Sequence, residues 1–163
     1  MKQWRIGLTV GVVVAIGAGF LFFRSDWPVR KEQPVVINDI AAPPIPTLNP
    51  DRVAQGEQLY AQYCAACHGP KLEGKPDWKT PLADGSYPPP PHDNSGHTWH
   101  HNDELLIRIV TNGGDTSYPS KMPAFRDKLS QDEVIAILDF IKSKWGNDER
   151  EFQWWNTAVG DQQ

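Results

Sequence analysis

The stretch GEQLYAQYCAACHG at residues 56–69 ends in the pattern C-x-x-C-H, formed by Cys64, Cys67 and His68. Two thiols at this spacing can reach the two vinyl groups of a single haem, and the adjacent imidazole then lies under the iron as its proximal ligand. We therefore predict that Cys64 and Cys67 bind haem c covalently and that His68 ligates the iron. The chain has no other cysteine, so the sequence has room for one such site.

Two other kinds of site compete with haem at this motif. A dithiol redox pair of the thioredoxin type would need a surrounding βαβ pattern, which the sequence does not show. A zinc site would need four ligands, which Cys64, Cys67, His97 and His101 could supply across a long loop rich in proline. We favour haem because the segments on both sides of the motif agree with it.

The segment before the motif predicts a helix over residues 52–63. Asn49-Pro50-Asp51 supplies a cap residue, a proline at the first helical position and an acid in the first turn. Gly56 lies inside this helix, where glycine costs about 1 kcal/mol. A glycine at such a position usually marks close packing against another element.

Two further helices are predicted downstream of the motif. One runs over about 103–111, capped by Asn102 and stopped at Gly113-Gly114. The other begins at the capping box 130–133. A stripe of apolar residues at helical spacing follows this box and predicts a helix packed on the core: Val134, Ile137, Leu138, Ile141 and Trp145.

Met122 is the only methionine besides Met1, and it lies in the stretch YPSKMPAF at 118–125. A residue that precedes proline is disfavoured in the helical region, which favours an extended loop here. The alternative role for a single methionine is to fill space in the core. The flanking prolines favour a thioether that points inward, so we predict Met122 as the sixth ligand of the iron.

Taken together, GEQLYAQYCAACHG (56–69), KMPAF (121–125) and LSQDEVIAILDFIKSKW (129–145) resemble the class I c-type cytochromes. The resemblance covers about residues 50–146 and implies an all-α, cytochrome c-like helical domain around one haem. It implies His68 and Met122 as axial ligands, and a crossing of the first and last helices near Gly56 against Phe140. It also implies single-electron transfer through an exposed haem edge. With both axial positions filled, the iron has no open site for a substrate, so we expect a protein that is not an enzyme. Trp99 stands where the family often has a tryptophan that bonds a haem propionate.

Four histidines lie within ten residues of the middle segment: His92, His97, His100 and His101. Imidazole suits copper or zinc, so a second metal site is one interpretation. Ligation of the iron by two histidines, with one of them displacing Met122, is another. The interpretation we favour is a loop around the haem edge.

The first 27 residues predict a membrane anchor with a single transmembrane helix. Residues 6–23 are uncharged and proline-free, and as a helix they would span roughly 27 Å. The bulky stretch 20–23 lies where a cleaved signal peptide would need small residues. Residues 28–49 form a proline-rich linker that we expect to resist helix and sheet, either as a spacer or as a strap over the domain. Residues 147–163 form a C-terminal tail whose Trp154 and Trp155 pack on the domain or face a partner.

The charge of the chain bears on its partners. From Asp51 onward the chain has 17 acidic and 11 basic side chains, which argues against nucleic acid as a ligand and allows docking to basic redox partner proteins. Haem c is attached on the exported side of a membrane, so we place the domain on the periplasmic or other extracytoplasmic face. The predicted function is electron transport in a respiratory or related chain. The alternatives are a fixed haem subunit of a larger membrane oxidoreductase complex, or a metal-handling protein that uses the 92–101 histidines.

Overall fold

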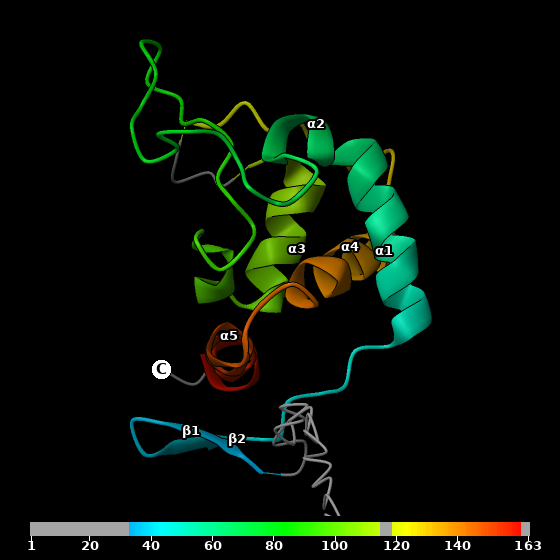
Figure 1. Ribbon diagram of the computed structural model, residues 1–163, viewed down its shortest axis with the longest axis vertical. Helices are drawn as coiled ribbons and strands as arrows, with labels where there is room; N and C mark the ends of the chain where they lie inside the picture. The colour runs from blue at the N-terminus through cyan, green and yellow to red at the C-terminus, as the bar shows by residue number, and fades with distance from the viewer. Residues whose placement is uncertain (1–32, 115–118, 161–163) are drawn as a thin grey trace, which may run out of the picture.

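The computed structural model describes residues 33–114 and 119–160, which form a mostly helical fold (Figure 1). The elements follow the order β1 (Val35–Ile37), β2 (Ile40–Ala42), α1 (Pro50–Tyr63), α2 (Ala65–His68), the 3-10 turn η1 (Thr98–His100), α3 (Asp103–Asn112), α4 (Gln131–Lys142) and α5 (Asn147–Val159). The predicted anchor at 6–23 lies outside the described residues. Within the ranges that are described, no helix is long and apolar enough to cross a membrane.

The residues predicted to cap the helices do so in the structure. The Asn49 side chain accepts hydrogen bonds from the backbone N–H groups of Asp51 and Arg52 at the start of α1. Asn102 accepts from Leu105 N–H at the start of α3, at 2.9 Å. Ser130 and Glu133 form the reciprocal capping box of α4. Each such cap satisfies backbone donors that a helix start would leave without partners, worth about 1 kcal/mol.

Helices α1 and α4 cross at Gly56, as the family resemblance implies. A Cβ atom at Gly56 would lie 1.9 Å from the carbonyl oxygen of Ala136 and 3.0 Å from Cβ of Phe140. The two backbones can approach this closely only because Gly56 has no side chain. Tyr60, one turn further along α1, then packs on Phe140 with ring centroids 5.3 Å apart.

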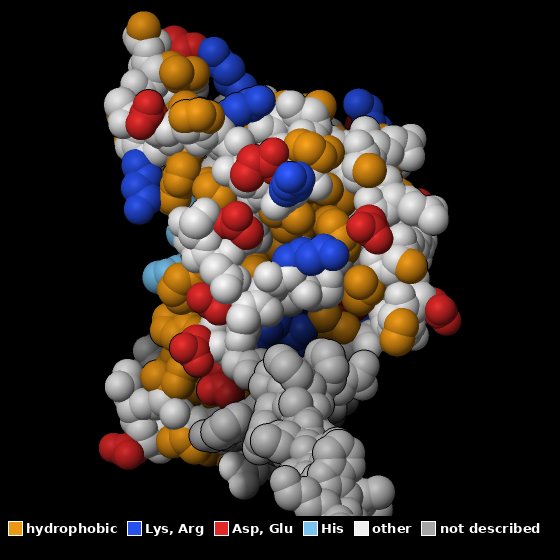
Figure 2. Space-filling view, viewed as in Figure 1, with side chains coloured by type: hydrophobic (Ala, Val, Ile, Leu, Met, Phe, Trp, Pro, Cys, Tyr) orange, Lys and Arg blue, Asp and Glu red, His pale blue; other side chains and the backbone are white. Residues whose placement is uncertain are grey.

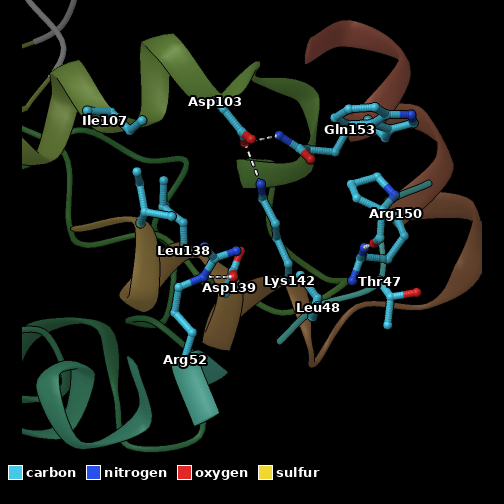
Figure 3. A pocket seen from close by; sticks show the side chains of 13 residues that line it. Thr47, Leu48, Arg52, Asp103, Ile107, Leu138, Asp139, Lys142, Arg150 and Gln153 are labelled. Atoms are coloured by element: carbon cyan, nitrogen blue, oxygen red, sulfur yellow. Dashed lines mark hydrogen bonds and ion pairs between the residues drawn. The ribbon is translucent and has the colours of Figure 1, made fainter. Parts of the chain in front are cut away.

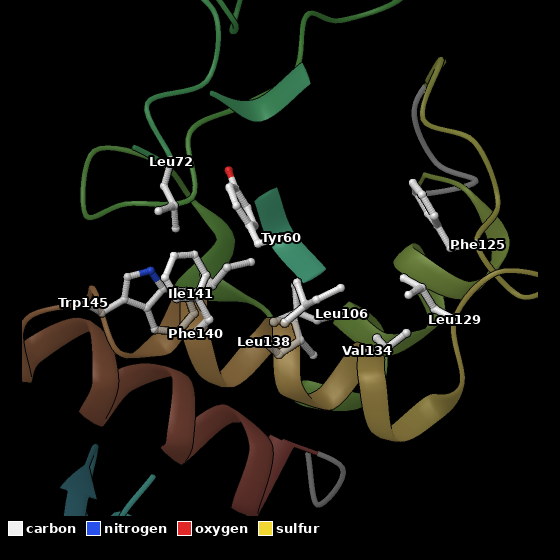
Figure 4. Close-up of a cluster of buried hydrophobic side chains, with 11 residues drawn as sticks. Tyr60, Leu72, Leu106, Phe125, Leu129, Val134, Leu138, Phe140, Ile141 and Trp145 are labelled. Carbon is white, nitrogen blue, oxygen red and sulfur yellow. The ribbon is translucent and has the colours of Figure 1, made fainter. Parts of the chain in front are cut away.

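The main core lies between α1, α3 and α4 (Figure 4). The predicted stripe of α4 is buried throughout, with Val134 and Ile137 each only 1% exposed. Leu72, Phe140 and Trp145 lie at one end of this core and Phe125 and Leu129 at the other, with Leu106 and Leu138 between them (Figure 4).

The linker forms structure that its prolines did not predict. Strands β1 and β2 pair antiparallel, with Val35 opposite Ala42, so the expectation that this segment forms no sheet is wrong for 35–42. The hairpin packs on α5 in a second small core that includes Trp155 and Val159. Of the two roles considered for the linker, residues 35–45 therefore have that of a strap packed on the rest of the chain, and the all-α prediction holds for the domain from Pro50 onward.

A cavity of about 140 Å³ lies where the linker meets α1, α3, α4 and α5, and none of residues 64–68 lines it (Figure 3). Charged side chains close around it in pairs. Arg52 donates to Asp139 at 2.6 Å, and Lys142 donates to Asp103 at 2.6 Å. Gln153 of α5 donates to the same Asp103 carboxylate at 2.7 Å, so this polar cluster fastens α5 to α3 and α4.

Candidate functional site

The C-x-x-C-H motif forms a single tight turn directly after α1. Cys64 ends α1 and also caps α2, and its carbonyl accepts hydrogen bonds from the N–H groups of Cys67 and His68 at 3.1 and 2.9 Å. Both thiols are free, with Cys64 half-buried and Cys67 exposed. The two thiols and the imidazole therefore share one turn, as the spacing predicts.

His68 is buried, and its ring is held by a backbone carbonyl. Its Nδ1 lies 2.9 Å from the carbonyl oxygen of Pro90. A carbonyl only accepts, so Nδ1 carries the hydrogen and Nε2 keeps its lone pair. Burial lowers the pKa of His68, which favours the neutral imidazole that a metal requires. The unprotonated Nε2 is thus the atom available to iron.

The segment after the motif fixes the position of Pro90. Gly74 N–H donates to the carbonyl of His68 at 2.7 Å, and Lys75 N–H donates to the carbonyl of Pro89 at 2.9 Å. The Tyr60 hydroxyl donates to the carbonyl of Gly69 at 2.9 Å and ties the segment to α1. Neither Pro90 nor Tyr60 has a role that is predicted from the sequence alone. The run of four prolines at 88–91 is the only sequence feature that points to Pro90, since each proline has a carbonyl acceptor but no backbone N–H.

Met122 lies in a loop without regular secondary structure, as predicted from the prolines around it. The N–H groups of Phe125 and Arg126 donate to the carbonyls of Val110 and Thr111, both at 3.2 Å, and pin this loop to the end of α3. Gly113 has a φ of +87°, and a Cβ there would lie 2.8 Å from the carbonyl oxygen of Met122. The Met122 side chain is half-buried against the main core. Its ligation of iron stays a prediction.

Trp99 lies in η1, half-buried against the main core. Its Nε1 is the one buried side-chain nitrogen or oxygen without a hydrogen-bond partner in the part of the chain that the structure describes. A buried donor without an acceptor costs about 1–3 kcal/mol. A carboxylate brought by a bound group would satisfy it, as expected for the predicted propionate contact.

The four histidines of the middle segment have different surroundings. His92 stacks on His68 with ring centroids 4.1 Å apart, and its Nδ1 lies 2.7 Å from the Thr98 hydroxyl. His97 stacks on Trp78 at 5.0 Å, and its ring also contacts that of His101. His100 packs on Trp99 at 3.8 Å.

This arrangement bears on the alternative metal sites. Among residues 33–114 and 119–160, no group of three or more His, Cys, Asp or Glu side chains could hold a metal ion. Within these residues, Cys64, Cys67, His97 and His101 are therefore not brought together as a zinc site, and the four histidines do not gather into such a group either. The His92 ring lies directly against that of His68, and ligation of the iron by two histidines stays an alternative to Met122.

The residues at the motif fit haem c. Two free thiols and a buried imidazole share one turn, the indole N–H of Trp99 lacks an acceptor within the described residues, and the loop that carries the thioether is anchored to α3. These are the groups that covalent attachment, axial ligation and propionate binding require.

Comparisons with known proteins agree with this chemistry. Residues 51–141 match the family described as "Cytochrome C oxidase, cbb3-type, subunit III". The chain is 28% identical to cytochrome c6 of Diacronema lutheri over 98 residues, covering 58% of this chain and 98% of that protein. It is also 28% identical to quinohemoprotein alcohol dehydrogenase ADH IIB of Pseudomonas putida over 121 residues, which make up 74% of this chain but 15% of the dehydrogenase. No solved structure matches the sequence.

The family match covers more than half of the 163 residues and includes the haem motif and all but one residue each of α1 and α4. The similarity to cytochrome c6 extends along almost the whole of that small protein. The chain therefore belongs to the family of cytochrome c domains described as cbb3-type subunit III, and with it to the class I c-type cytochromes, which carry haem c and transfer electrons.

Proposed function

We propose that this protein is a membrane-anchored cytochrome with one covalent haem, which carries single electrons between separate partner proteins on the outer face of a membrane. The observation that carries the proposal is the motif turn. It presents the two thiols of Cys64 and Cys67 beside a buried imidazole whose Nδ1 is already engaged by the Pro90 carbonyl. These are the groups that covalent haem attachment and axial ligation use.

The bound haem supplies reversible one-electron chemistry at its iron. His68 offers Nε2 in the neutral form, and the hydrogen bond from Nδ1 to Pro90 orients the ring. Met122 offers its thioether from a loop that α3 holds in place. If protein side chains hold both axial positions, no position is left for a substrate, which supports a carrier rather than an enzyme.

The membrane part of the proposal rests on residues 6–23. This uninterrupted apolar run is long enough to cross a membrane once as a helix. The linker that leads to β1 follows it. Since haem c is attached on the exported side, the domain would lie on the periplasmic or extracytoplasmic face.

Docking to redox partners is proposed to be electrostatic and weak. Charges of both signs are interspersed over the face seen in Figure 2, while the chain from Asp51 onward is acidic overall. Lys121, next to the predicted ligand, is paired with Asp84. The charge of Lys121 is therefore balanced by that of Asp84, and Lys121 alone does not make the surface beside Met122 positive. A basic partner surface is the better complement to the overall charge.

A second candidate is a fixed haem subunit of a larger membrane complex. The description of the matching family, a subunit of a cytochrome c oxidase, favours it. In that case the domain would stay bound to its partners, and its charge would matter less for electron transfer.

Extraction of the native protein from membranes tests the anchor and distinguishes the two candidates. We expect the haem protein to sediment with membranes, to elute alone after gentle detergent extraction, and to retain its first residues by mass.

The electron-transfer rate of the haem protein to a separate basic partner should fall as ionic strength rises, because salt screens charges beyond about 10 Å at 0.1 M. A soluble form that begins after Phe23 would contradict the anchor. Co-elution with other subunits and a rate that is flat with salt would favour the second candidate.

A further inference from the structure

Helix α5 lies outside the residues that match the family, and one of its faces holds the linker. Trp155 donates from Nε1 to the carbonyl of Ile40 at 2.9 Å, and Trp154 donates from Nε1 to the carbonyl of Pro43 at 2.7 Å. Val159, one turn further, is buried against β1 and β2. This face of α5 therefore fixes the strap that leads toward the N-terminus.

The other face of α5 forms hydrogen bonds with residues at the end of the turn that carries Trp99. Gln153 donates to the carbonyl of His101 at 3.3 Å and to the Asp103 carboxylate at 2.7 Å. The Thr157 hydroxyl accepts from the N–H of Asp103 at 3.1 Å. Together with the bond from Asn156 to the carbonyl of His100, these contacts hold residues 100–103 at several points.

Phe152 is the residue of this face that reaches the aromatic rings of the turn. Its ring meets Trp99 edge to face, with centroids 5.6 Å apart and an interplanar angle of 84°. It also packs on His100 at 5.4 Å. Because His100 itself lies on Trp99 at 3.8 Å, Phe152 and His100 together limit how the indole can turn.

The Trp99 indole has a single donor, and that donor is buried without an acceptor among the residues described. Its value as a donor depends on where the ring is held, since a hydrogen bond weakens steeply away from good alignment. The protein provides that restraint through α5, which the matching family region does not include.

We propose that Phe152 is a positioning residue that acts through Trp99 and thereby sets the reduction potential of the haem. The inference rests on the proposed function, because the acceptor for Trp99 Nε1 is taken to be a haem propionate. A donor at a propionate disperses its negative charge, and less negative charge near the iron favours the reduced state. Loss of the restraint should weaken that hydrogen bond and lower the potential.

The test uses the full-length holoprotein and measures its midpoint potential in a double-mutant cycle. We expect Trp99→Phe and Phe152→Ala each to lower the midpoint potential. Phe152→Tyr keeps an aromatic ring and should leave the potential at the wild-type value. Adding Phe152→Ala to the Trp99→Phe variant should cause no further shift. A wild-type potential in Phe152→Ala, or an equal shift in both backgrounds, would overturn the proposal.

Trp154→Phe is the matched control, because it removes a bond on the opposite face of α5 and leaves the turn untouched. It should leave the potential unchanged. If Phe152→Ala does not fold, Phe152→Leu carries the same test. The visible spectrum of every variant reports separately whether haem is attached. A colourless wild-type protein contradicts the proposed function itself, whereas coloured protein with an unmoved potential contradicts the role of Phe152 alone.

Discussion

Replacing Met122 by alanine is expected to abolish the weak near-infrared charge-transfer band of the oxidised protein and to lower its reduction potential. The band reports a sulfur ligand, and Met122 is the only methionine besides Met1. Axial ligands set haem potentials over a range of about 0.8 V, so the loss of a thioether should be among the largest effects of any single substitution. Absorption of the oxidised protein and a redox titration measure both results.

Lys121→Ala is the control for this prediction. It alters the same loop and removes the ion pair with Asp84, yet it leaves the thioether in place, so the band should persist. A wild-type spectrum that lacks the band and shows bis-imidazole features would contradict Met122 as the ligand. The sixth ligand would then have to come from the histidines at 92–101.

The second large effect concerns Gly56. Replacing it by alanine adds one methyl group, which in an exposed helix would stabilise by up to about 1 kcal/mol. Here the added Cβ would lie 1.9 Å from the carbonyl oxygen of Ala136, a backbone atom that cannot turn aside. Separating α1 from α4 should cost about 3 kcal/mol or more and lower the melting temperature by more than about 10 °C.

Gly160→Ala provides the matched control, since Gly160 has helical dihedrals and its nearest contact to an added Cβ is 3.9 Å away. Thermal denaturation followed by far-ultraviolet circular dichroism should show a large drop for Gly56→Ala and almost none for Gly160→Ala. Equal melting temperatures for the two variants would show that the α1–α4 crossing is not as close as described.

Much of this fold could be predicted because its signals are local. Caps at Asn49, Asn102 and Ser130 each depend on residues within one helical turn, and the stripe of α4 depends only on periodicity. The contact of Gly56 with α4 is long-range, and the resemblance to a known family supplied it. The proline content of the linker does not predict the β1–β2 hairpin, because proline disfavours sheet, whereas the strands lie between the prolines at 34 and 43.

The sequence predicts the reactive residues of the site, but it does not predict the residues that orient them. The motif identifies Cys64, Cys67 and His68 by spacing alone. Pro90 and Phe152 act through a backbone carbonyl and a ring contact 22 and 53 residues away from the groups they orient. Residue type and spacing carry no such information, because these contacts exist only once the loop and α5 are packed.

One measurement tests the central claim, a single haem held covalently by Cys64 and Cys67. Acid–acetone treatment of the purified native protein, followed by intact mass analysis, separates bound from extractable haem. We expect colour to stay with the protein and its mass to exceed that of the polypeptide by one haem. The double variant Cys64→Ser with Cys67→Ser should lose both signals. Haem that extracts freely from the wild-type protein, or a mass equal to the bare chain, would contradict the claim.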